Sequence, residues 1–320
     1  MKKAILLIYT GSPDSYRIRD VMKYLYRFLN DRRIISLPRF FRFLIVCRCV
    51  FSLCSYVSSK RYRLLAGVYQ GVFPLPFYCD FLKEQLKKEL DVEVFIGMCF
   101  GKPLIEDCLQ TIVNKDISKL MIMPMYPHYS SSASGVPLER ALKGLSKFRV
   151  IPEIVSVNSF FREKGFIDAF VERIKEYDYH SFDGIVFSYH SLPLSHVAKW
   201  DGKYPGECVE TTRLICNELG IEQAITCFQS QMSKRWLGPT AKSVLLEMIK
   251  NGKTRALVVA PSFVADCLET EVEINIELKK FFIDNGGKEL QLVKSLNDNP
   301  TWINFIVQKY NELFQAEMVR

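Results

Sequence analysis

Short apolar runs rich in β-branched residues alternate along the chain with longer segments whose apolar positions recur every three or four residues. The short runs end in turn residues, which is typical of buried strands, and the longer segments have the period of amphipathic helices. We expect strands near residues 4–9, 92–97, 119–125, 149–156, 184–189, 224–228, 255–261 and 290–295. We expect helices over 18–30, 79–90, 104–115, 160–177, 207–219 and 239–251, with a last helix over 302–317.

This alternation of strand and helix predicts an α/β fold with parallel sheets and helices on both faces. Four predicted strands fall in each half of the 320-residue chain, so we expect two similar lobes, each with a four-stranded parallel sheet flanked by helices. The length also suits two lobes better than one domain. We place the N-terminal lobe at 1–148, the C-terminal lobe at 149–297, and a closing helix that packs back on the N-terminal lobe at 298–320.

Positive charge is concentrated near the N-terminus. The whole chain has a formal net charge of +8, yet residues 1–63 alone hold fourteen Lys and Arg against three Asp. Such a region suits nucleic acid, an anionic membrane surface or an acidic small molecule. The chain has no helix-turn-helix signature, zinc finger or other nucleic-acid module, so we favour the other two and expect no nucleic-acid partner.

Residues 40–57 are strongly apolar but are interrupted by Arg42 and Arg48. Two arginines near the middle of a spanning helix would cost roughly 5–7 kcal/mol on insertion scales, so we do not expect this segment to span a membrane. It could lie on a membrane surface, form an apolar lip over a ligand, or be an amphipathic core helix. Composition leaves these alternatives open.

The ten cysteines are scattered along the chain without a C-x-x-C pair. In a chain of this length, that pattern is typical of reduced, mostly buried thiols in a cytosolic protein. Cys47 and Cys49 are separated by one residue and have no histidine nearby, which makes a soft metal site a weak interpretation. Buried free thiols are the better prediction for both.

In sheets of this kind, ligands bind beyond the carboxyl ends of the strands. No G-x-G-x-x-G or Walker loop follows a predicted strand, so a nucleotide is disfavoured. His190 comes just after the strand at 184–189 and before Leu192 and Pro193. Imidazole suits proton transfer near neutral pH and also ligates Fe²⁺. By position alone, a histidine that caps the strand end is an equally good interpretation.

A ladder of carboxylates follows the seventh strand. Glu269, Glu273 and Glu277 are spaced by four residues, about 6 Å apart along a helix axis, and Asp266 lies just upstream. A locally widened helix would align them better, and π-bulges favour functional sites. The ladder could pass a divalent cation inward, although by spacing alone a solvated acidic face is the commoner explanation. The apolar stripe that we expect to face the core beside it consists of Leu268, Val272 and Ile276.

Several longer segments resemble the signatures of the ferrochelatase family, in the correct order and over nearly the whole chain. Residues 125–130 are similar to the family's L-Y-P-Q-Y-S, and residues 187–193 to its F-S-x-H-G-L-P. Several long motifs in register are far more specific than any one of them. The segments that carry the resemblance are Ser12-Pro13-Asp14, residues 24–35, Leu37-Pro38, Met125-Tyr126-Pro127-His128-Tyr129-Ser130, Phe187-Ser188-Tyr189-His190-Ser191-Leu192-Pro193, Phe228-Gln229-Ser230, Trp236-Leu237-Gly238-Pro239, and Phe263-Val264-Ala265-Asp266-Cys267-Leu268-Glu269-Thr270 with Glu273.

The resemblance implies a chelatase-like fold of two Rossmann-like lobes with a porphyrin in the cleft between them. It implies a ferrochelatase that inserts Fe²⁺ into protoporphyrin IX to form protohaem, with release of two protons, as the last step of haem biosynthesis. Porphyrin and ferrous iron are then substrates, and no resident cofactor is expected. The lip of the family's pocket, often membrane-facing, corresponds to residues 36–60, so this segment could contact the inner face of the membrane peripherally. We also expect a monomer that is located in the cytoplasm.

The resemblance also assigns roles to single residues. The family's invariant active-site histidine corresponds to His190 and its invariant glutamate to Glu269, while its inner acidic series corresponds to Glu273 and Glu277. His190 would accept the porphyrin protons, and the metal ligands would be His190, Glu269 and Glu273, held weakly so that the iron can leave them. The expected substrate-binding residues are Thr10, Tyr129 and Ser130, with Arg39 and Arg42 for the porphyrin propionates.

Some positions depart from the family pattern. Ser131 stands where members with a [2Fe–2S] cluster have a cysteine, and Cys267 is the last cysteine of the chain, so we expect no cluster. His128 replaces the family's usual glutamine, and Cys99-Phe100 replaces an Arg-Tyr pair that faces the pocket. The residues do not decide between protoporphyrin IX and coproporphyrin III, but the absence of a tyrosine at position 10 favours protoporphyrin.

Two rival functions remain open at this point. One is a related chelatase that loads cobalt or nickel into an earlier tetrapyrrole. The other is a non-catalytic porphyrin or haem carrier on the same fold, which would bind porphyrin without turnover. A nucleotide-dependent Rossmann enzyme is a more distant third, because the glycine fingerprint is missing.

Overall fold

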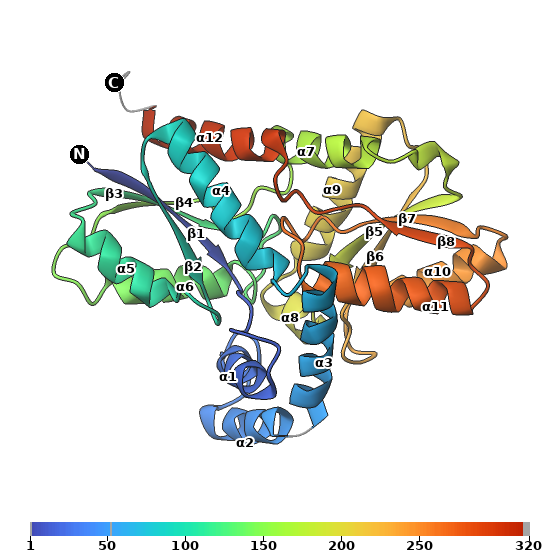
Figure 1. Ribbon diagram of the computed structural model, residues 1–320, viewed down its shortest axis with the longest axis horizontal. Coiled ribbons are helices and arrows are strands. Elements are labelled where there is room, and N and C mark those ends of the chain that lie inside the picture. Colours follow the sequence, from blue (N-terminus) through green and yellow to red (C-terminus); the bar gives the residue numbers. More distant parts are fainter. Residues whose placement is uncertain (1, 52, 316–320) are drawn as a thin grey trace. The chain divides into compact units, whose positions relative to one another are not determined.

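The computed structural model describes residues 2–51 and 53–315, and the strands in these ranges form two four-stranded sheets (Figure 1). Contacts between residues divide the chain into two compact units. Unit 1 comprises Met1–Met125, Ser130–Asn158 and Val307–Arg320, and unit 2 comprises Tyr126–Tyr129 and Ser159–Ile306. The lobe limits proposed from the sequence, 1–148, 149–297 and 298–320, stay predictions.

The sheet of unit 1 has the strand order β2-β1-β3-β4, and every neighbouring pair is parallel. Alternate residues of β1 point to opposite faces, and Ala4, Leu6 and Ile8 pack into a core with helices α5 and α6. Both faces are covered, so β1 and β3 are apolar along nearly their whole length. The strands are β1 (Lys3–Tyr9), β2 (Glu93–Met98), β3 (Lys119–Pro124) and β4 (Glu153–Ser156), and the two helices are α5 (Ile105–Asn114) and α6 (Gly135–Leu145).

Four further helices of unit 1 lie between β1 and β2 in the sequence. No single helix in the described ranges is long and apolar enough to cross a membrane. Taken together, helices α2 and α3, which are bent by 57° at their junction, have the length and apolar composition that a membrane-crossing segment needs. The four helices are α1 (Ile18–Leu29), α2 (Arg39–Val50), α3 (Leu53–Val68) and α4 (Pro74–Leu90).

The sheet of unit 2 has the order β6-β5-β7-β8 and is also parallel throughout. Figure 1 shows α10 and α11 on one side of this sheet, where they share a core with Val186 and Val258, and α9 on the other side. The strands are β5 (Gly184–His190), β6 (Ala224–Gln229), β7 (Arg255–Val259) and β8 (Glu289–Leu292). The helices are α7 (Lys164–Lys175), α8 (Leu194–Lys199), α9 (Tyr204–Leu219), α10 (Ala241–Lys250), α11 (Lys279–Asp284) and α12 (Pro300–Gln315), with a 3-10 turn η1 (Tyr179–Ser181) and a π-helix η2 (Leu268–Leu278).

The predicted fold class is therefore confirmed: an α/β chain with two parallel four-stranded sheets in its described ranges, each flanked by helices. The strand predicted over 149–156 is shorter than expected, because only residues 153–156 pair with β3. Val150 and Ile151 are apolar but exposed, and the pattern of apolar residues therefore extended the strand too far. Helix α12 begins in unit 2 and ends in unit 1, where Lys3 Nζ donates to the carbonyl of Phe314.

Candidate active site

His190 is the last residue of β5, at the carboxyl end of the second sheet. Its Nδ1 lies 2.7 Å from the carbonyl oxygen of Ser191. A carbonyl can only accept, so Nδ1 carries the proton and Nε2 keeps its lone pair. The backbone is held as well, since the Tyr204 hydroxyl donates to the His190 carbonyl at 2.6 Å and the His190 N–H donates to Ser262 Oγ at 3.3 Å. In the neutral imidazole, this contact therefore fixes the tautomer that has its lone pair on Nε2.

The carboxylate ladder lies on a widened helix, which aligns its carboxylates better than an α-helix would. The loop after β7 leads into the π-helix η2, which contains Glu269, Glu273 and Glu277, all half-buried. The expected apolar stripe is partly wrong, because Leu268 and Ile276 are only half-buried. The wider i→i+5 bonding turns different residues inward. The buried apolar residues of η2 are Val272, Ile274 and Leu278.

Glu273 is held by the residue that follows β6. The backbone N–H of Ser230 donates to Glu273 Oε1 at 2.6 Å, and the Ser230 hydroxyl donates to Oε2 at 2.8 Å. Burial raises the pKa of Glu273 above its usual value. The Ser230 hydrogen bonds and the proximity of His190 oppose that rise, whereas the Glu269 carboxylate adds to it. His190, Glu269 and Glu273 thus form one electrostatic group within unit 2.

The first turn of η2 is held by the neighbouring strands. Gln229, which is 3% exposed, lies opposite His190 in the β5–β6 pairing. Its Nε2 donates to the backbone carbonyl of Glu269 at 3.0 Å, and its Oε1 accepts from Ser188 Oγ at 2.8 Å. The end of the sheet therefore holds the start of the helix that contains the carboxylates.

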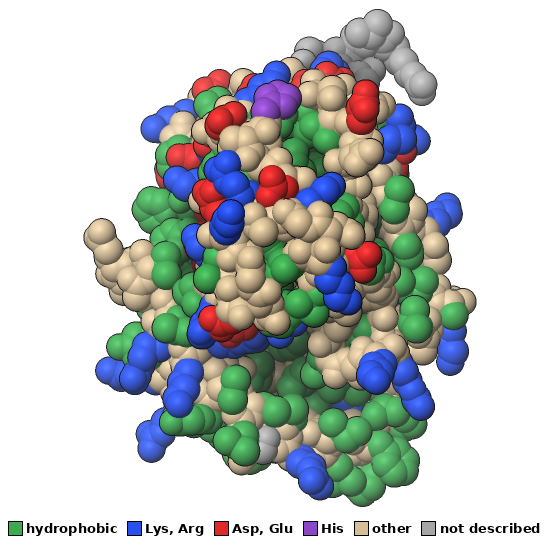
Figure 2. Space-filling view, turned by 90° about the vertical axis from the view of Figure 1, so that its right-hand side faces the viewer, with side chains coloured by type: hydrophobic (Ala, Val, Ile, Leu, Met, Phe, Trp, Pro, Cys, Tyr) green, Lys and Arg blue, Asp and Glu red, His purple; other side chains and the backbone are tan. Residues whose placement is uncertain are grey.

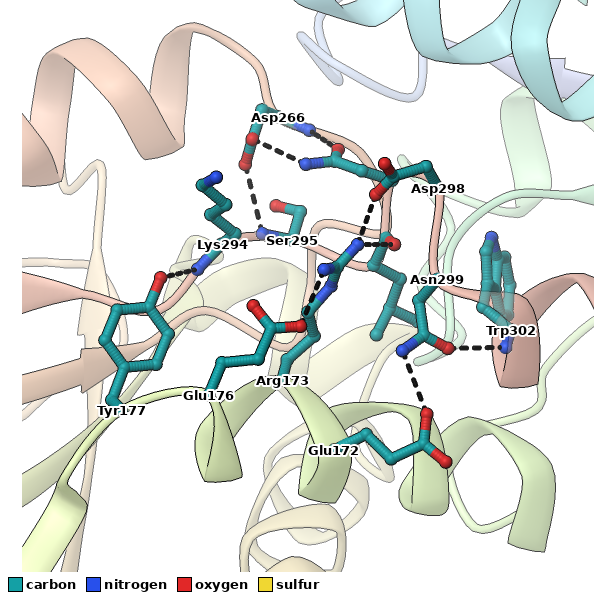
Figure 3. A network of polar contacts seen from close by, with 12 residues as sticks. Glu172, Arg173, Glu176, Tyr177, Asp266, Lys294, Ser295, Asp298, Asn299 and Trp302 are labelled. Carbon is teal, nitrogen blue, oxygen red and sulfur yellow. Dashed lines mark hydrogen bonds and ion pairs between the residues drawn. The ribbon is translucent and has the colours of Figure 1, made fainter.

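Asp266 is buried upstream of the ladder and serves as an anchor for the loop. Asn297 Nδ2 donates to Asp266 Oδ2 at 2.6 Å, and the Asp266 N–H donates back to Asn297 Oδ1 at 2.9 Å. The N–H of Ser295 donates to Oδ1 of the same carboxylate at 3.1 Å. Figure 3 shows Asp266 above Ser295 and, nearby, Arg173 of α7, which donates to the carbonyl of Leu296 and to Asp298. The hydrogen bonds of Asp266 therefore hold the loop before η2 in place.

The other three histidines lie elsewhere. His128 is 2% exposed, and burial lowers its pKa to about 3. Its Nε2 lies 2.9 Å from Thr211 Oγ1, whose own proton goes to the carbonyl of Phe161. His196 is buried too, which lowers its pKa, and His180 is exposed against the ring of Tyr179. His190 is therefore the histidine that the structure places beside the carboxylates.

The expected porphyrin contacts belong mostly to unit 1. Thr10 is half-buried and follows β1, and Arg39 is exposed at the start of α2. Arg42 donates to the carbonyl of Leu37 at 3.0 Å. Ser130 is 1% exposed, and its hydroxyl accepts from the N–H of Ala133 at 3.0 Å. Tyr129 belongs to unit 2, where its ring is exposed and its N–H donates to Glu207.

Cys99 and Phe100, which replace the Arg-Tyr pair of the family pattern, are buried in the core of unit 1. Phe100 packs edge-on against Phe28, with ring centroids 5.2 Å apart. The guanidinium of Arg140 lies 5.6 Å from the Phe100 ring and donates to the carbonyl of Cys99. These two residues therefore serve packing in unit 1.

Within the described ranges, no group of three or more His, Cys, Asp or Glu side chains is arranged to hold a metal ion. A cavity of about 750 Å³ in unit 2 is lined by Arg162, Lys203, Glu207 and neighbouring residues. None of the three candidate active-site residues of unit 2 lines it. The candidate site is therefore defined by the convergence of His190, Glu269 and Glu273.

Comparisons with known proteins agree with this arrangement. A family model described as Ferrochelatase matches residues 2–313. The chain is 35% identical over 299 residues to coproporphyrin III ferrochelatase of Enterococcus faecalis, covering 92% of this chain and 95% of that protein. It is 33% identical over 336 residues to ferrochelatase of Legionella pneumophila, covering 98% of this chain and all of that protein. SirB from Bacillus subtilis with Fe³⁺ has a TM-score of 0.61 at 15% identity, covering 99% of this chain and 98% of that one, a likeness of fold alone.

Proposed function

Because this chain belongs to the ferrochelatase family, we propose that it inserts Fe²⁺ into protoporphyrin IX, forming protohaem and releasing two protons. The observation that carries the proposal is the hydrogen bond between His190 Nδ1 and the Ser191 carbonyl, which fixes the tautomer of the neutral imidazole. Its Nδ1–H is taken by the Ser191 carbonyl, so Nε2 is a base beside the carboxylates of Glu269 and Glu273. Metalation of a free porphyrin requires such a base, because two pyrrole protons occupy the place of the metal.

His190 has the role of proton acceptor in this proposal. Bending of the macrocycle by binding energy exposes the pyrrole nitrogens, a form of ground-state strain. Nε2 then takes a proton, and the nearby carboxylates stabilise the imidazolium that forms. The Tyr204 and Ser262 contacts fix the backbone of His190, which keeps the imidazole in place.

Iron is a substrate here, so its protein ligands must hold it weakly. We assign His190, Glu269 and Glu273 as transient ligands. Both Glu273 oxygens already accept hydrogen bonds from Ser230, which lowers their capacity as donors to a cation. A carboxylate whose oxygens already accept hydrogen bonds binds a metal ion more weakly, which suits transfer of the metal better than retention.

The porphyrin contacts are proposed from the family resemblance. We assign Arg39 and Arg42 to the propionates, since a guanidinium pairs well with a carboxylate. Thr10, Tyr129 and Ser130 are assigned to the macrocycle. The buried hydroxyl of Ser130 already accepts from Ala133, so its contribution is through local backbone geometry.

A specific observation keeps coproporphyrin III as a second candidate substrate. The relative from Enterococcus faecalis is named for that porphyrin, and it is 35% identical to this chain. The threonine at position 10, where a tyrosine is absent, favours protoporphyrin IX. A non-catalytic porphyrin carrier is the alternative from another class.

We further propose a cluster-free, monomeric, cytoplasmic enzyme that contacts the membrane through residues 36–60. Ser131 replaces the cluster cysteine. Figure 2 shows apolar side chains with Lys and Arg among them at the lower end, at the height of α2 and α3 in Figure 1. The most exposed apolar residues of this region are Phe40, Phe41, Phe51, Leu53 and Val57. Cationic residues around an apolar patch favour an anionic membrane surface.

The test is an anaerobic assay of purified protein with Fe²⁺ and either porphyrin, which follows the change from free-porphyrin to metalloporphyrin absorption. The variants are His190→Ala and Glu269→Gln, with His180→Ala as the matched control. His180 is exposed in η1, which precedes the amino end of β5, whereas His190 lies at the carboxyl end of that strand. We expect loss of roughly 10²–10⁴-fold in kcat for His190→Ala, the usual range for removal of a general base.

Each outcome has a distinct meaning. Turnover that is lost in both folded variants but retained in the control supports a chelatase that uses these residues, and the faster porphyrin identifies the substrate. Porphyrin binding without turnover, on both porphyrins and with cobalt and nickel as well as iron, leaves a carrier. Turnover only with cobalt or nickel indicates the related chelatase class.

A further inference from the structure

The junction of α2 and α3 brings two thiols into contact. Cys49 lies near the end of α2 and Cys54 near the start of α3, and their sulfur atoms are 3.2 Å apart. All ten cysteines lie in the described ranges and none is in a disulfide, and Cys54 alone among them is exposed. The pair therefore combines a close sulfur–sulfur contact with access from solvent.

A second contact fixes the same junction. The hydroxyl of Ser55 donates to the carbonyl of Val50 at 2.5 Å, and both residues are buried, at 0% and 2% exposure. Each is the chain neighbour of one of the two cysteines. The N–H of Phe51 also donates to the carbonyl of Cys47, which closes the last turn of α2. The backbone on both sides of the bend is thus held in a geometry that keeps the two sulfur atoms together.

We propose that Cys49 and Cys54 form a dithiol modification site that low-molecular-weight disulfides oxidise to an intramolecular disulfide. A disulfide bond is ~2.0 Å long, so the sulfur atoms need to approach by only roughly 1 Å. Two adjacent side-chain rotations can supply that movement. The bond would join α2 to α3 across their bend and hold that bend at a fixed angle.

The reaction has two thiol–disulfide exchange steps. The Cys54 thiolate attacks one sulfur of the small disulfide, forming a mixed disulfide and releasing one small thiol. The Cys49 sulfur then loses its proton to solvent and attacks Cys54, which releases the second small thiol. The two protein thiols lose two electrons and two protons, and the small disulfide gains both. Cys54 attacks first because it is exposed, and because burial raises the pKa of Cys49 to about 11.

Cys47 provides the natural control. It is half-buried on the same helix, two residues before Cys49, and residues spaced by two do not share a helix face. Six other cysteines are buried, and Cys267 is half-buried in unit 2. A reagent that oxidises thiols by exposure alone would therefore modify Cys54 without joining it to Cys49.

The experiment incubates the purified, folded, full-length chain with glutathione disulfide, quenches with an alkylating agent, and maps the products by mass spectrometry. We expect the wild type and Cys47→Ser to lose two hydrogens and to yield a Cys49–Cys54 linked peptide that a dithiol reductant reverses. Cys49→Ser should stop at a glutathione adduct on Cys54. In Ser55→Ala the Cys49–Cys54 disulfide should form several-fold more slowly, because this variant loses the Ser55–Val50 hydrogen bond that aligns the junction.

Three results would overturn the proposal. One is a wild-type chain that does not react, and another is a glutathione adduct on Cys54 that persists as long in the wild type as in Cys49→Ser. The third is a disulfide that contains Cys47 in place of Cys49. Because the readout is mass and thiol state, this test is independent of whether the chain metalates a porphyrin.

Discussion

Ser230 donates two hydrogen bonds to Glu273, one from its backbone N–H and one from its hydroxyl, so both carboxylate oxygens have the same partner. Ser230 adopts a φ of +63°, a left-handed conformation that costs a residue with a side chain roughly 1–2 kcal/mol. The chain keeps this conformation directly after β6, where it aims the N–H and the hydroxyl at η2. We interpret Ser230 as a positioning residue for Glu273.

Substitution of Ser230 should separate the contribution of its hydroxyl hydrogen bond from that of its backbone hydrogen bond. Ser230→Ala removes the hydroxyl bond and keeps the backbone bond, and Ser230→Gly does the same while relieving the strained φ. We expect both to reduce kcat/KM for Fe²⁺ by roughly fivefold, the factor for a lost hydrogen bond of about 1 kcal/mol. Without the hydroxyl, the pKa of Glu273 rises further, so the acidic limb of the pH–rate profile should move to higher pH.

Ser233→Ala is the matched control for Ser230, since Ser233 is exposed in the same loop and its hydroxyl accepts from the N–H of Arg235. A pH–rate profile that is unchanged in Ser230→Ala, with a uniform loss of rate, would argue that the effect is merely structural.

His128 should make the protein sensitive to acid. Burial lowers its pKa from 6.5 to about 3, so below pH 6.5 the unfolded chain binds a proton that the folded chain excludes. Stability is fully present above pH 6.5 and is lost as the pH falls toward 3. At pH 5 the loss relative to pH 7 is roughly 2 kcal/mol.

His128→Gln should remove this part of the acid sensitivity, because the glutamine amide can still donate to Thr211 and does not titrate. Urea unfolding at pH 7 and pH 5 measures it, with His180→Gln as the exposed control. An equal loss of stability in wild type and His128→Gln would show that other groups cause the acid sensitivity.

The pair Asp266–Asn297 should contribute to global stability. Asn297→Ala removes two hydrogen bonds, one of them to a buried carboxylate, and places alanine at a φ of +45°. We expect a loss of roughly 3 kcal/mol in the free energy of unfolding. Asn297→Gly should recover about 1 kcal/mol of that loss, because glycine adopts positive φ without strain. Urea denaturation tests both, and a loss below about 0.5 kcal/mol in Asn297→Ala would contradict the anchoring role.

The exposed apolar residues of α2 and α3 should bind anionic vesicles. Phe51 and Leu53 are 73% and 74% exposed, beside the cationic Arg48. The double variant Phe51→Ser/Leu53→Ser should weaken vesicle binding by at least about tenfold, since each side chain loses over 1 kcal/mol of apolar burial. Sedimentation with phosphatidylglycerol vesicles measures this, and Val150→Ser, at an equally exposed apolar residue outside the two helices, should bind like wild type. Wild-type protein that stays in the supernatant would remove the membrane proposal.

Local pattern was sufficient to locate the strands and most of the longer helices, whereas helices α6, α8 and α11 were not predicted. Each predicted strand is present, although the one near 149–156 is shorter than predicted. The prediction is easiest for β1 and β3, because a short apolar run that is buried along nearly its whole length is typical of a parallel sheet with both faces covered. The spacing of Glu269, Glu273 and Glu277 indicated a helix with carboxylates about one turn apart, and the position of His190 after an apolar strand indicated its place at the carboxyl end of the sheet. These features depend on neighbours within one or two turns of the chain.

Tertiary structure decided what those residues touch. Ser230 meets Glu273 across 43 residues of chain, and Asp266 meets Asn297 across 31 residues. Such pairs depend on strand order and on the register of β5 with β6, which no local period encodes. The inward residues of η2 also changed with its wider hydrogen bonding, so the predicted stripe was only partly right. The sequence by itself determined where the strands and most of the longer helices form and which residues have reactive groups, whereas the packing of distant strands and loops determined the partners, and hence the orientation, of those groups.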